Sequence, residues 1–416
     1  MKKLFLSALA FIGLIFTGCD FVDDSDLLSN LGVLTTLEDG SIRVSGIFLN
    51  QTIEFTNDNI YRLSKRVIFG EGSTLNIGAG TIIKAETGTG VDASSLIIAR
   101  NATINANGTA SQPIIMTSAS DDIALGETTS SIAFNSNSRG LWGGLVILGN
   151  APISAGGNAV AGFNGSEAQI EGVSSDVIEG RYGGSDNSDS SGSLSYVSIR
   201  FAGTDIASDN ELNGLTLGGV GDGTTINNIE IYAGFDDGIE FFGGSVDVTN
   251  IIVNGQGDDA VDGDQGYSGI VSNVVVISND SNSGFEFDGP EADLLTDSFY
   301  TIRNATLMGP SKARIAELKS GARVVIDNVL AKGYTDEEIQ INGGIASMNF
   351  NDGDTMLTNW EIVDTRMVSN IVTTDQIGLT SSLDFLNVIS SESSATVSGA
   401  DTSVFSWTLS SERGDI

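Results

Sequence analysis

The chain has 416 residues, with 54 aspartates and glutamates against 19 lysines and arginines, a formal net charge of −35 and no histidine. The acidic excess argues against nucleic acid as a partner, because phosphates require a basic surface; it suits an extracellular surface, cations or cationic partners. The lack of histidine excludes Ser-His and Cys-His catalysis and the usual zinc sites, so no zinc is expected, and neither is haem or a nucleotide.

The first 18 residues have the pattern of an export signal. Lys2 and Lys3 precede an apolar run that ends at Phe16 and is too short for a comfortable membrane span. Thr17-Gly18-Cys19 follows, and this junction resembles a bacterial lipobox. We therefore predict a lipoprotein signal peptide at residues 1–18 and lipid attachment at Cys19, the only cysteine. The alternative is an ordinary secretory signal with an unrelated cysteine.

Residues 19–40 are predicted to form an acidic tether after the lipidated cysteine. The segment 20–26 contains four aspartates. An acidic cluster at this place resembles the surface-export signal of Bacteroidota lipoproteins, which would place the protein on the outer membrane, facing the exterior. The alternative is a plain polar linker.

Residues 41–416 are predicted to form a single domain. In residues 41–120, short apolar runs such as 73–84 and 95–100 alternate with Gly and Asn turns, which is typical of short strands. Residues 121–139 lack this alternation and are predicted to be an inserted loop.

Seven asparagines recur in the second half of the chain, each close to an apolar strand and 22 to 31 residues from the next. They are Asn228, Asn250, Asn273, Asn304, Asn328, Asn359 and Asn387. Such a recurrence indicates stacked units of strand, turn, strand and turn. We predict an all-β, right-handed parallel β-helix, in which the longer intervals contain inserted surface loops. Equivalent residues then lie about 4.8 Å apart, so the asparagines would form an internal ladder of buried, mutually bonded amides.

Acidic residues follow the asparagines at a fixed distance. Glu240, Asp262, Glu286, Glu317 and Gln340 lie 12 or 13 residues after the first five asparagines and alternate with apolar residues, so they should face outward from strands. Carboxylates about 5 Å apart repel each other by just under about 1 kcal/mol in water and by more where water is excluded. Bound Ca²⁺, which prefers oxygen ligands, would relieve this repulsion. The predicted ligands are Asp236, Asp237, Glu240, Asp258, Asp259, Asp262, Asp264, Glu286 and Asp288; the alternative is a solvated acidic face without metal.

The same residues are the candidates for catalysis if the protein is an enzyme. Paired carboxylates hydrolyse glycosidic bonds, and Ca²⁺ with a basic residue supports elimination from acidic polysaccharides. The catalytic set would be Asp236, Asp237, Glu240, Asp258, Asp262 and Arg314. Lys312, Arg314, Lys319 and Arg323 cluster around Glu317. They could receive an acidic sugar, but we favour the interpretation that they neutralise neighbouring acids.

Several longer segments carry a family resemblance. They are residues 141–153 (Leu-Trp-Gly-Gly-Leu-Val-Ile-Leu-Gly-Asn-Ala-Pro-Ile), residues 236–244 and the closing residues 405–408. They resemble a family of Bacteroidota outer-membrane lipoproteins with right-handed parallel β-helices. This resemblance implies a fold and a cellular location, but it implies little about chemistry. The first hypothesis is a non-enzymatic binding, adhesion or uptake-accessory module, with a glycan or an outer-membrane receptor protein as partner. The alternative is a calcium-dependent polysaccharide lyase or a carboxylate-based glycoside hydrolase.

Overall fold

Runs of three or four β-branched and aromatic residues between Gly- and Asn-rich turns favour short strands. The computed structural model describes residues 31–88, 90–207, 210–278, 281–309, 313–334, 339–374 and 378–416. The predicted signal peptide, Cys19, most of the predicted tether and Lys312 lie outside the described residues. Residues 32–416 form one unit, in which 25 of the strands join in a continuous stack.

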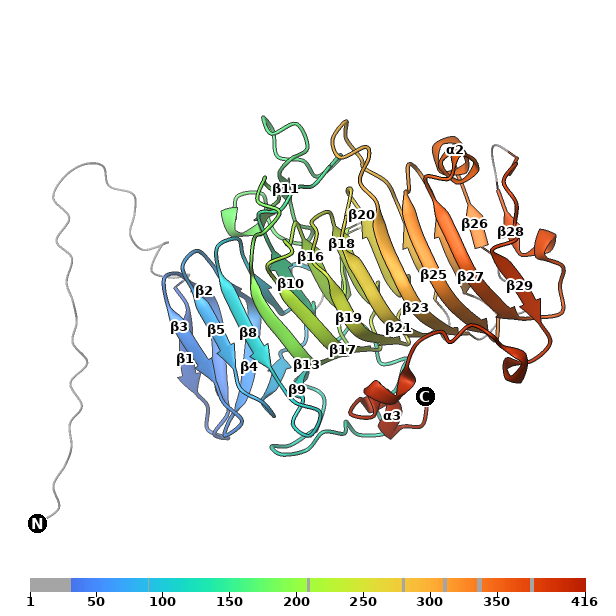
Figure 1. Cartoon of the computed structure of the whole chain (residues 1–416). Coiled ribbons are helices and arrows are strands. Elements are labelled where there is room, and N and C mark those ends of the chain that lie inside the picture. Colours follow the sequence, from blue (N-terminus) through green and yellow to red (C-terminus); the bar gives the residue numbers. More distant parts are fainter. Residues whose placement is uncertain are drawn as a thin grey trace, which may run out of the picture. The chain divides into compact units, whose positions relative to one another are not determined.

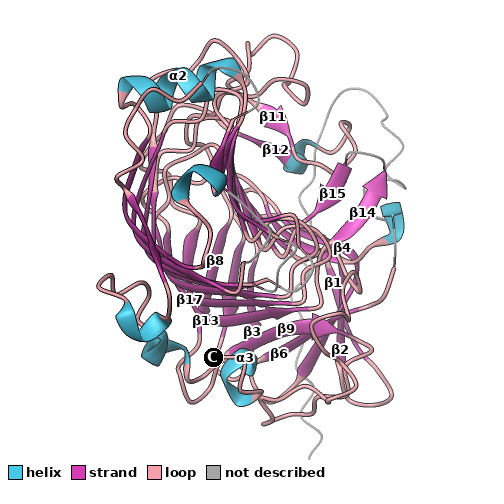
Figure 2. Cartoon of the chain, turned by 90° about the vertical axis from the view of Figure 1, so that its right-hand side faces the viewer, coloured by secondary structure: helices cyan, strands magenta, loops and turns pink. Residues whose placement is uncertain are grey.

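Most strands of this unit stack in parallel and form three faces, which we call faces A, B and C (Figures 1 and 2). Face A begins with the second halves of β2 (Ile42–Phe48) and β4 (Ile60–Phe69). It continues through β7 (Ser95–Ile98), β10 (Leu145–Leu148), β16 (Leu215–Gly218), β18 (Ile239–Phe242), β20 (Val261–Asp264), β22 (Ser283–Phe287), β24 (Arg314–Leu318), β26 (Ile339–Ile341) and β28 (Val372–Thr373).

Faces B and C share long, bent strands. Face B begins with β3 (Thr52–Phe55), β5 (Thr74–Ile77) and β8 (Thr103–Asn107), and face C with the first halves of β2 and β4, then β6 (Ile82–Ala85) and β9 (Ile114–Ser118). The next strand, β13 (Gly192–Arg200), pairs with β8 through its first half and with β9 through its second. It is followed by β17 (Thr225–Tyr232), β19 (Val248–Asn254), β21 (Ile270–Ile277), β23 (Tyr300–Met308), β25 (Val324–Lys332) and β27 (Met356–Val363), and face C closes with β29 (Leu386–Ile389).

The inward side chains form one continuous apolar core that extends from Val44 to Leu386. Rings stack within it: the centroids of Phe48 and Phe69 are 4.8 Å apart, and those of Phe241 and Tyr267 are 4.2 Å apart. Each rung buries its apolar face only against its neighbours, as in other solenoids. The predicted all-β parallel β-helix is confirmed.

The asparagine ladder lies at the bend between faces B and C. Six of the seven asparagines have φ between 53° and 60° (Asn228, Asn250, Asn273, Asn304, Asn328 and Asn359), a left-handed conformation that asparagine tolerates better than most residues. Amide-to-amide hydrogen bonds connect Asn250 to Asn228 (3.1 Å), Asn273 to Asn250 (2.8 Å) and Asn328 to Asn304 (2.7 Å).

Two details of the predicted ladder are wrong. The ladder is not internal, because the left-handed bend turns these side chains outward, where they are half-buried or exposed. Asn387 is not a member, because it pairs in register with Glu361, two residues beyond the ladder position, and donates to that carboxylate at 3.3 Å.

The stack begins earlier than the predicted boundary at residue 41. A first strand, β1 (Val33–Thr36), pairs antiparallel with β2. All four of its residues are exposed, so the strand shows no alternation of buried and exposed positions that would set it apart from a tether.

Several insertions lie outside the three faces of the stack. The largest, residues 149–191, includes β11 (Ala168–Gln169) and β12 (Arg181–Tyr182) and is called the 149–191 insertion below. The predicted loop 121–139 contains no strand. The other elements are β14 (Thr204–Ala207), β15 (Asn210–Leu212), the helix α2 (Gly344–Asp352) and the 3-10 turns Gly90–Asp92, Ile178–Gly180, Val368–Asn370 and Glu392–Ser394.

The last residues of the chain run back along face C (Figure 1). This C-terminal strap, residues 396–416, includes a 3-10 turn (Thr402–Phe405) and α3 (Leu409–Glu412). Its backbone N–H groups donate to side chains of successive rungs: Thr396 to Glu361 at 2.7 Å, Asp401 to Asn273 at 2.6 Å and Ser410 to Glu230 at 2.8 Å. Glu230 and Glu361 are buried beneath it.

Among the helices of the described residues, none is both long and apolar enough to cross a membrane.

Candidate functional site

The outward polar residues of face A are aligned from rung to rung. Strand alternation places Ile239 and Phe241 in the core and Glu240 between them on the outer side, and the same pattern repeats in the next strands. The residues in register are Thr216, Glu240, Asp262, Glu286, Glu317 and Gln340, which we call the acidic row.

A second set of carboxylates lies in the turns that lead into face A. Asp237 Oδ1 accepts the N–H of Asp259, its equivalent in the next rung, at 2.8 Å. Asn213 occupies the equivalent place one rung earlier, and its Oδ1 accepts the N–H of Asp237 at 3.2 Å. Each side chain thus holds the turn of the next rung, which fixes the positions of these aspartates.

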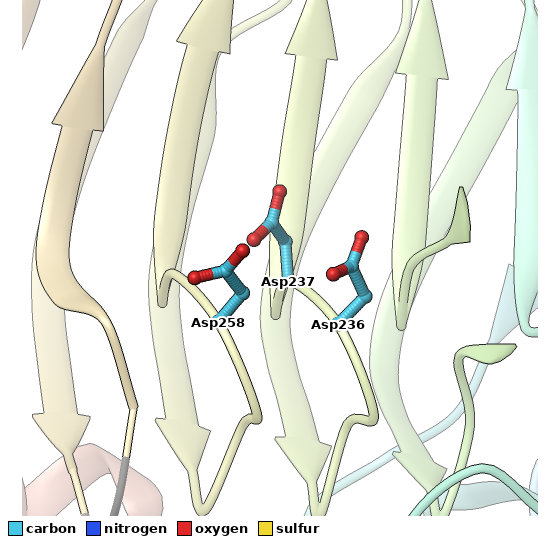
Figure 3. Close-up of side chains that lie close together, drawn as sticks. All are labelled: Asp236, Asp237 and Asp258. Atoms are coloured by element: carbon cyan, nitrogen blue, oxygen red, sulfur yellow. The ribbon is translucent and has the colours of Figure 1, made fainter. Parts of the chain in front are cut away.

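The two sets meet at the rungs of β18 and β20. One carboxylate oxygen from each of Asp236, Asp237 and Asp258 lies within 4.8 Å of the other two, and Figure 3 shows the three side chains projecting to the same side of adjacent turns. The same limit holds for Asp237, Glu240 and Asp262. Asp237 belongs to both groups, so five of the nine predicted metal ligands form one contiguous patch, called the carboxylate patch below.

Burial raises the pKa of these carboxyl groups, and neighbouring like charges raise it further. The pKa of Asp236 rises to about 8 through burial and the charge of Asp258. The pKa values of Asp237, Glu240 and Asp262 are well above their ordinary values, in each case through burial first and then a neighbouring carboxylate. A freely solvated acidic face therefore does not describe the patch, since its groups are buried or half-buried.

One oxygen of the patch has no partner. Oδ1 of Asp262 is buried and makes no hydrogen bond within the described residues. A buried carboxylate oxygen without a donor is costly, so this atom is suited to a cation.

The remaining four predicted ligands have other partners. Lys319 forms ion pairs with Glu286 and Asp288, the second at 3.5 Å. Asp259 accepts from the hydroxyl of Ser283, and Asp264 Oδ1 accepts the N–H of Gln265 at 2.6 Å. They extend the acidic surface without joining the patch.

The predicted basic cluster neutralises the far end of the acidic row. Arg314 pairs with Glu317 at 2.9 Å. Burial lowers the pKa of Lys319, but the hydrogen bond and charge of Glu286 outweigh this and hold it above its ordinary value. Arg323 pairs instead with Asp297 at 3.0 Å and Asp354 at 2.9 Å.

Residues that sequence reasoning missed complete the surroundings of the patch. Asn213 donates to Glu240; its place 24 residues before Asp237 could have identified it. The charge of Glu171, from the 149–191 insertion, contributes to the raised pKa of Glu240 after burial. Nothing in the sequence near Glu171 indicates that it lies beside face A.

Among the described residues, the cavities of about 580, 480, 630 and 140 Å³ have none of the nine predicted ligands in their linings. The carboxylate patch is therefore separate from these four cavities.

The comparisons with known proteins agree with this architecture. A family model described as a pectate-lyase-like β-helix domain matches residues 47–411. No curated protein matches the chain, and no solved structure does either. Because the family model covers nearly all of the stacked rungs, the chain belongs to the pectate-lyase-like β-helix family.

Proposed function

We propose that the protein is a non-enzymatic binding module of the outer-membrane surface, anchored through Cys19, which binds a glycan through Ca²⁺ held by the carboxylate patch. The observation that carries the proposal is the convergence of Asp237, Glu240 and Asp262 within 4.8 Å beside an unpartnered oxygen of Asp262. An adhesion or uptake-accessory role would follow from such binding at the cell surface.

Calcium suits the chemistry of the patch. Its ligand atoms are all carboxylate oxygens, and Ca²⁺ takes six to eight oxygens in flexible geometry, whereas Mg²⁺ requires a stricter octahedron. The five carboxylates supply part of that shell, and water or sugar hydroxyls can complete it. A bound cation would also remove the repulsion that raises the pKa values of these groups.

A glycan is supported by the family, whose description names a polysaccharide-cleaving enzyme. It is also supported by the regular spacing of the row, since equivalent side chains on successive rungs form a straight polar track. A track of this kind suits an extended, repetitive ligand.

Binding without cleavage is favoured by the state of the basic residues. Elimination requires a base that can lose its proton near neutral pH. Lys319 has a raised pKa, and Arg314 is held by Glu317 and Asn282. Neither side chain is prepared to accept a proton from a substrate.

The second candidate is a lyase or hydrolase that uses Asp236, Asp237, Glu240, Asp258, Asp262 and Arg314. The pKa of Asp236, about 8, favours this candidate, because a carboxyl group protonated at neutral pH is suited to act as a general acid.

Calcium titration calorimetry on the purified, chelator-treated protein tests the metal site. We expect saturable binding by the wild type and by Asp58→Asn, a control at an exposed carboxylate outside the site. For Asp262→Asn we expect binding at least about tenfold weaker. Equal binding by both variants, or none by the wild type, would remove the proposed site.

A glycan array with and without calcium then tests the ligand. Retention of one class of polysaccharide only with calcium supports a binding module. New ultraviolet absorbance from an unsaturated sugar, or new reducing ends, would instead favour the lyase or the hydrolase. Labelling of wild type and Cys19→Ala with a fatty-acid analogue, together with protease treatment of intact cells, tests the anchor and its orientation.

A further inference from the structure

The 149–191 insertion contains a cavity that the carboxylate patch does not use. Its volume is about 580 Å³, within the range of small-molecule sites. The polar side chains that line it are Asn158, Gln169, Glu171, Ser175 and Arg181, and the rest of the lining is small or apolar.

Arg181 is the notable member of this lining. It lies on β12, in register with Gln169 of β11. The structure places no ion-pair or hydrogen-bond partner on its guanidinium among the described residues, although the chain carries 54 acidic residues. Several other arginines are paired, as Arg100 is with Glu167 at 3.2 Å and Arg314 with Glu317 at 2.9 Å. A guanidinium presents five donors in a planar fork that matches carboxylate and sulfate groups.

The neighbouring groups offer complementary chemistry. The amide nitrogen of Gln169 donates to the carbonyls of Val173, Ser174 and Val177, which fixes the side chain, whereas its Oε1 is buried and accepts no hydrogen bond within the described residues. Burial raises the pKa of Glu171. The lining of the cavity thus combines one cation and one carboxyl group with a buried acceptor just beneath its surface, which together suit a molecule with hydroxyl groups and a single anionic group.

We propose that this cavity is a separate binding site for one saccharide unit that carries a carboxylate or a sulfate ester. Arg181 holds the anionic group, and Gln169 and Glu171 contact hydroxyl groups. The saccharide character rests on the proposed function, whereas the recognition of an anion rests on Arg181 alone.

The test uses calorimetry of the purified protein with glucuronate, glucose 6-sulfate and glucose, each with calcium and with chelator. Arg181→Gln removes the cation without removing an internal contact. Gly157→Phe fills the cavity from a lining position where an added Cβ meets nothing within 4 Å. The matched controls are Arg43→Gln, at an exposed arginine of β2, and Gly378→Phe, at another glycine where a Cβ meets nothing within 4 Å.

We expect at least one charged sugar to bind in preference to glucose. Arg181→Gln should weaken that binding by about tenfold or more, Gly157→Phe should abolish it, and both controls should bind as the wild type does. The charged sugar that binds identifies the anionic group. Equal binding of glucose and the charged sugars, or unchanged binding by Arg181→Gln, overturns the proposal. If the sugar binds but calcium does not, the proposed function fails while this site stands; if calcium binds and no charged sugar does, only this site fails.

Discussion

The molecule stacks two kinds of side chain at the repeat of the β-helix, with opposite physical results. At the bend between faces B and C, the amide of Asn250 donates to Asn228 and accepts from Asn273. At face A, carboxylate oxygens of Asp237, Glu240 and Asp262 converge within 4.8 Å but, when ionised, can only accept. Stacking at this repeat therefore lets amides hydrogen-bond to one another, whereas it brings carboxylates together without donors. Such frustration is expected at functional sites, where a ligand relieves it.

The carboxylate of Glu230 sharpens this comparison, because both of its oxygens accept hydrogen bonds. Its oxygens accept from Ser198, Leu409 and Ser410. We expect Glu230→Ala to destabilise the fold by about 3 kcal/mol, because several donors lose their acceptor in a buried place. Urea denaturation measures the loss, and limited proteolysis should cut the C-terminal strap first. Stability equal to that of Asp58→Ala would show that the strap is not held by this residue.

At the carboxylate patch we expect a substitution to stabilise the fold instead of destabilising it. Asp237→Asn should stabilise the calcium-free protein by about 1–2 kcal/mol, since it removes a buried acid from a set of like charges. Its amide oxygen can still accept the N–H of Asp259, as that of Asn213 does for Asp237. The variant should also lose any rise in Tm on adding calcium. A less stable variant in chelator would mean that the patch is not strained.

The pH dependence follows from the raised pKa values. A carboxyl group whose folded pKa lies above its unfolded value favours folding at low pH and loses this contribution as pH rises through the folded pKa. For Asp236 the window extends from its ordinary value of 3.8 to about 8. In chelator, Tm should therefore rise by several degrees between pH 8 and pH 5.5, and calcium should flatten the slope. A calcium-free Tm that falls toward pH 5.5 contradicts this assignment.

The smallest effect is expected in the amide ladder. Asn273→Leu should cost about 1 kcal/mol, because it breaks bonds to Asn250 and Asp401 and places a branched residue at φ 57°. Asn387→Leu is the control, because Asn387 lies outside the ladder. Thermal denaturation of both variants decides whether ladder membership matters.

The sequence predicted the features that repeat. The fixed recurrence of Asn and of Glu240, Asp262 and Glu286 placed the rungs and the acidic row, because strand alternation and a constant repeat length determine both. It did not predict that the ladder faces outward, since a left-handed bend leaves the apolar pattern of the strands unchanged. It also could not place Glu171 near the patch, because irregular insertions have no period. The role of Arg181 depended on the absence of a partner, which no pattern of residues records.

The strap has a consequence for folding. Residues 396–416 attach to rungs that lie much earlier in the sequence, from Glu230 in β17 to Glu361 in β27. Their attachment points come into line only when every intervening rung has stacked, since a missing or slipped rung displaces them by about 4.8 Å. The strap can therefore make all of its contacts only with a helix whose intervening rungs are complete and in register.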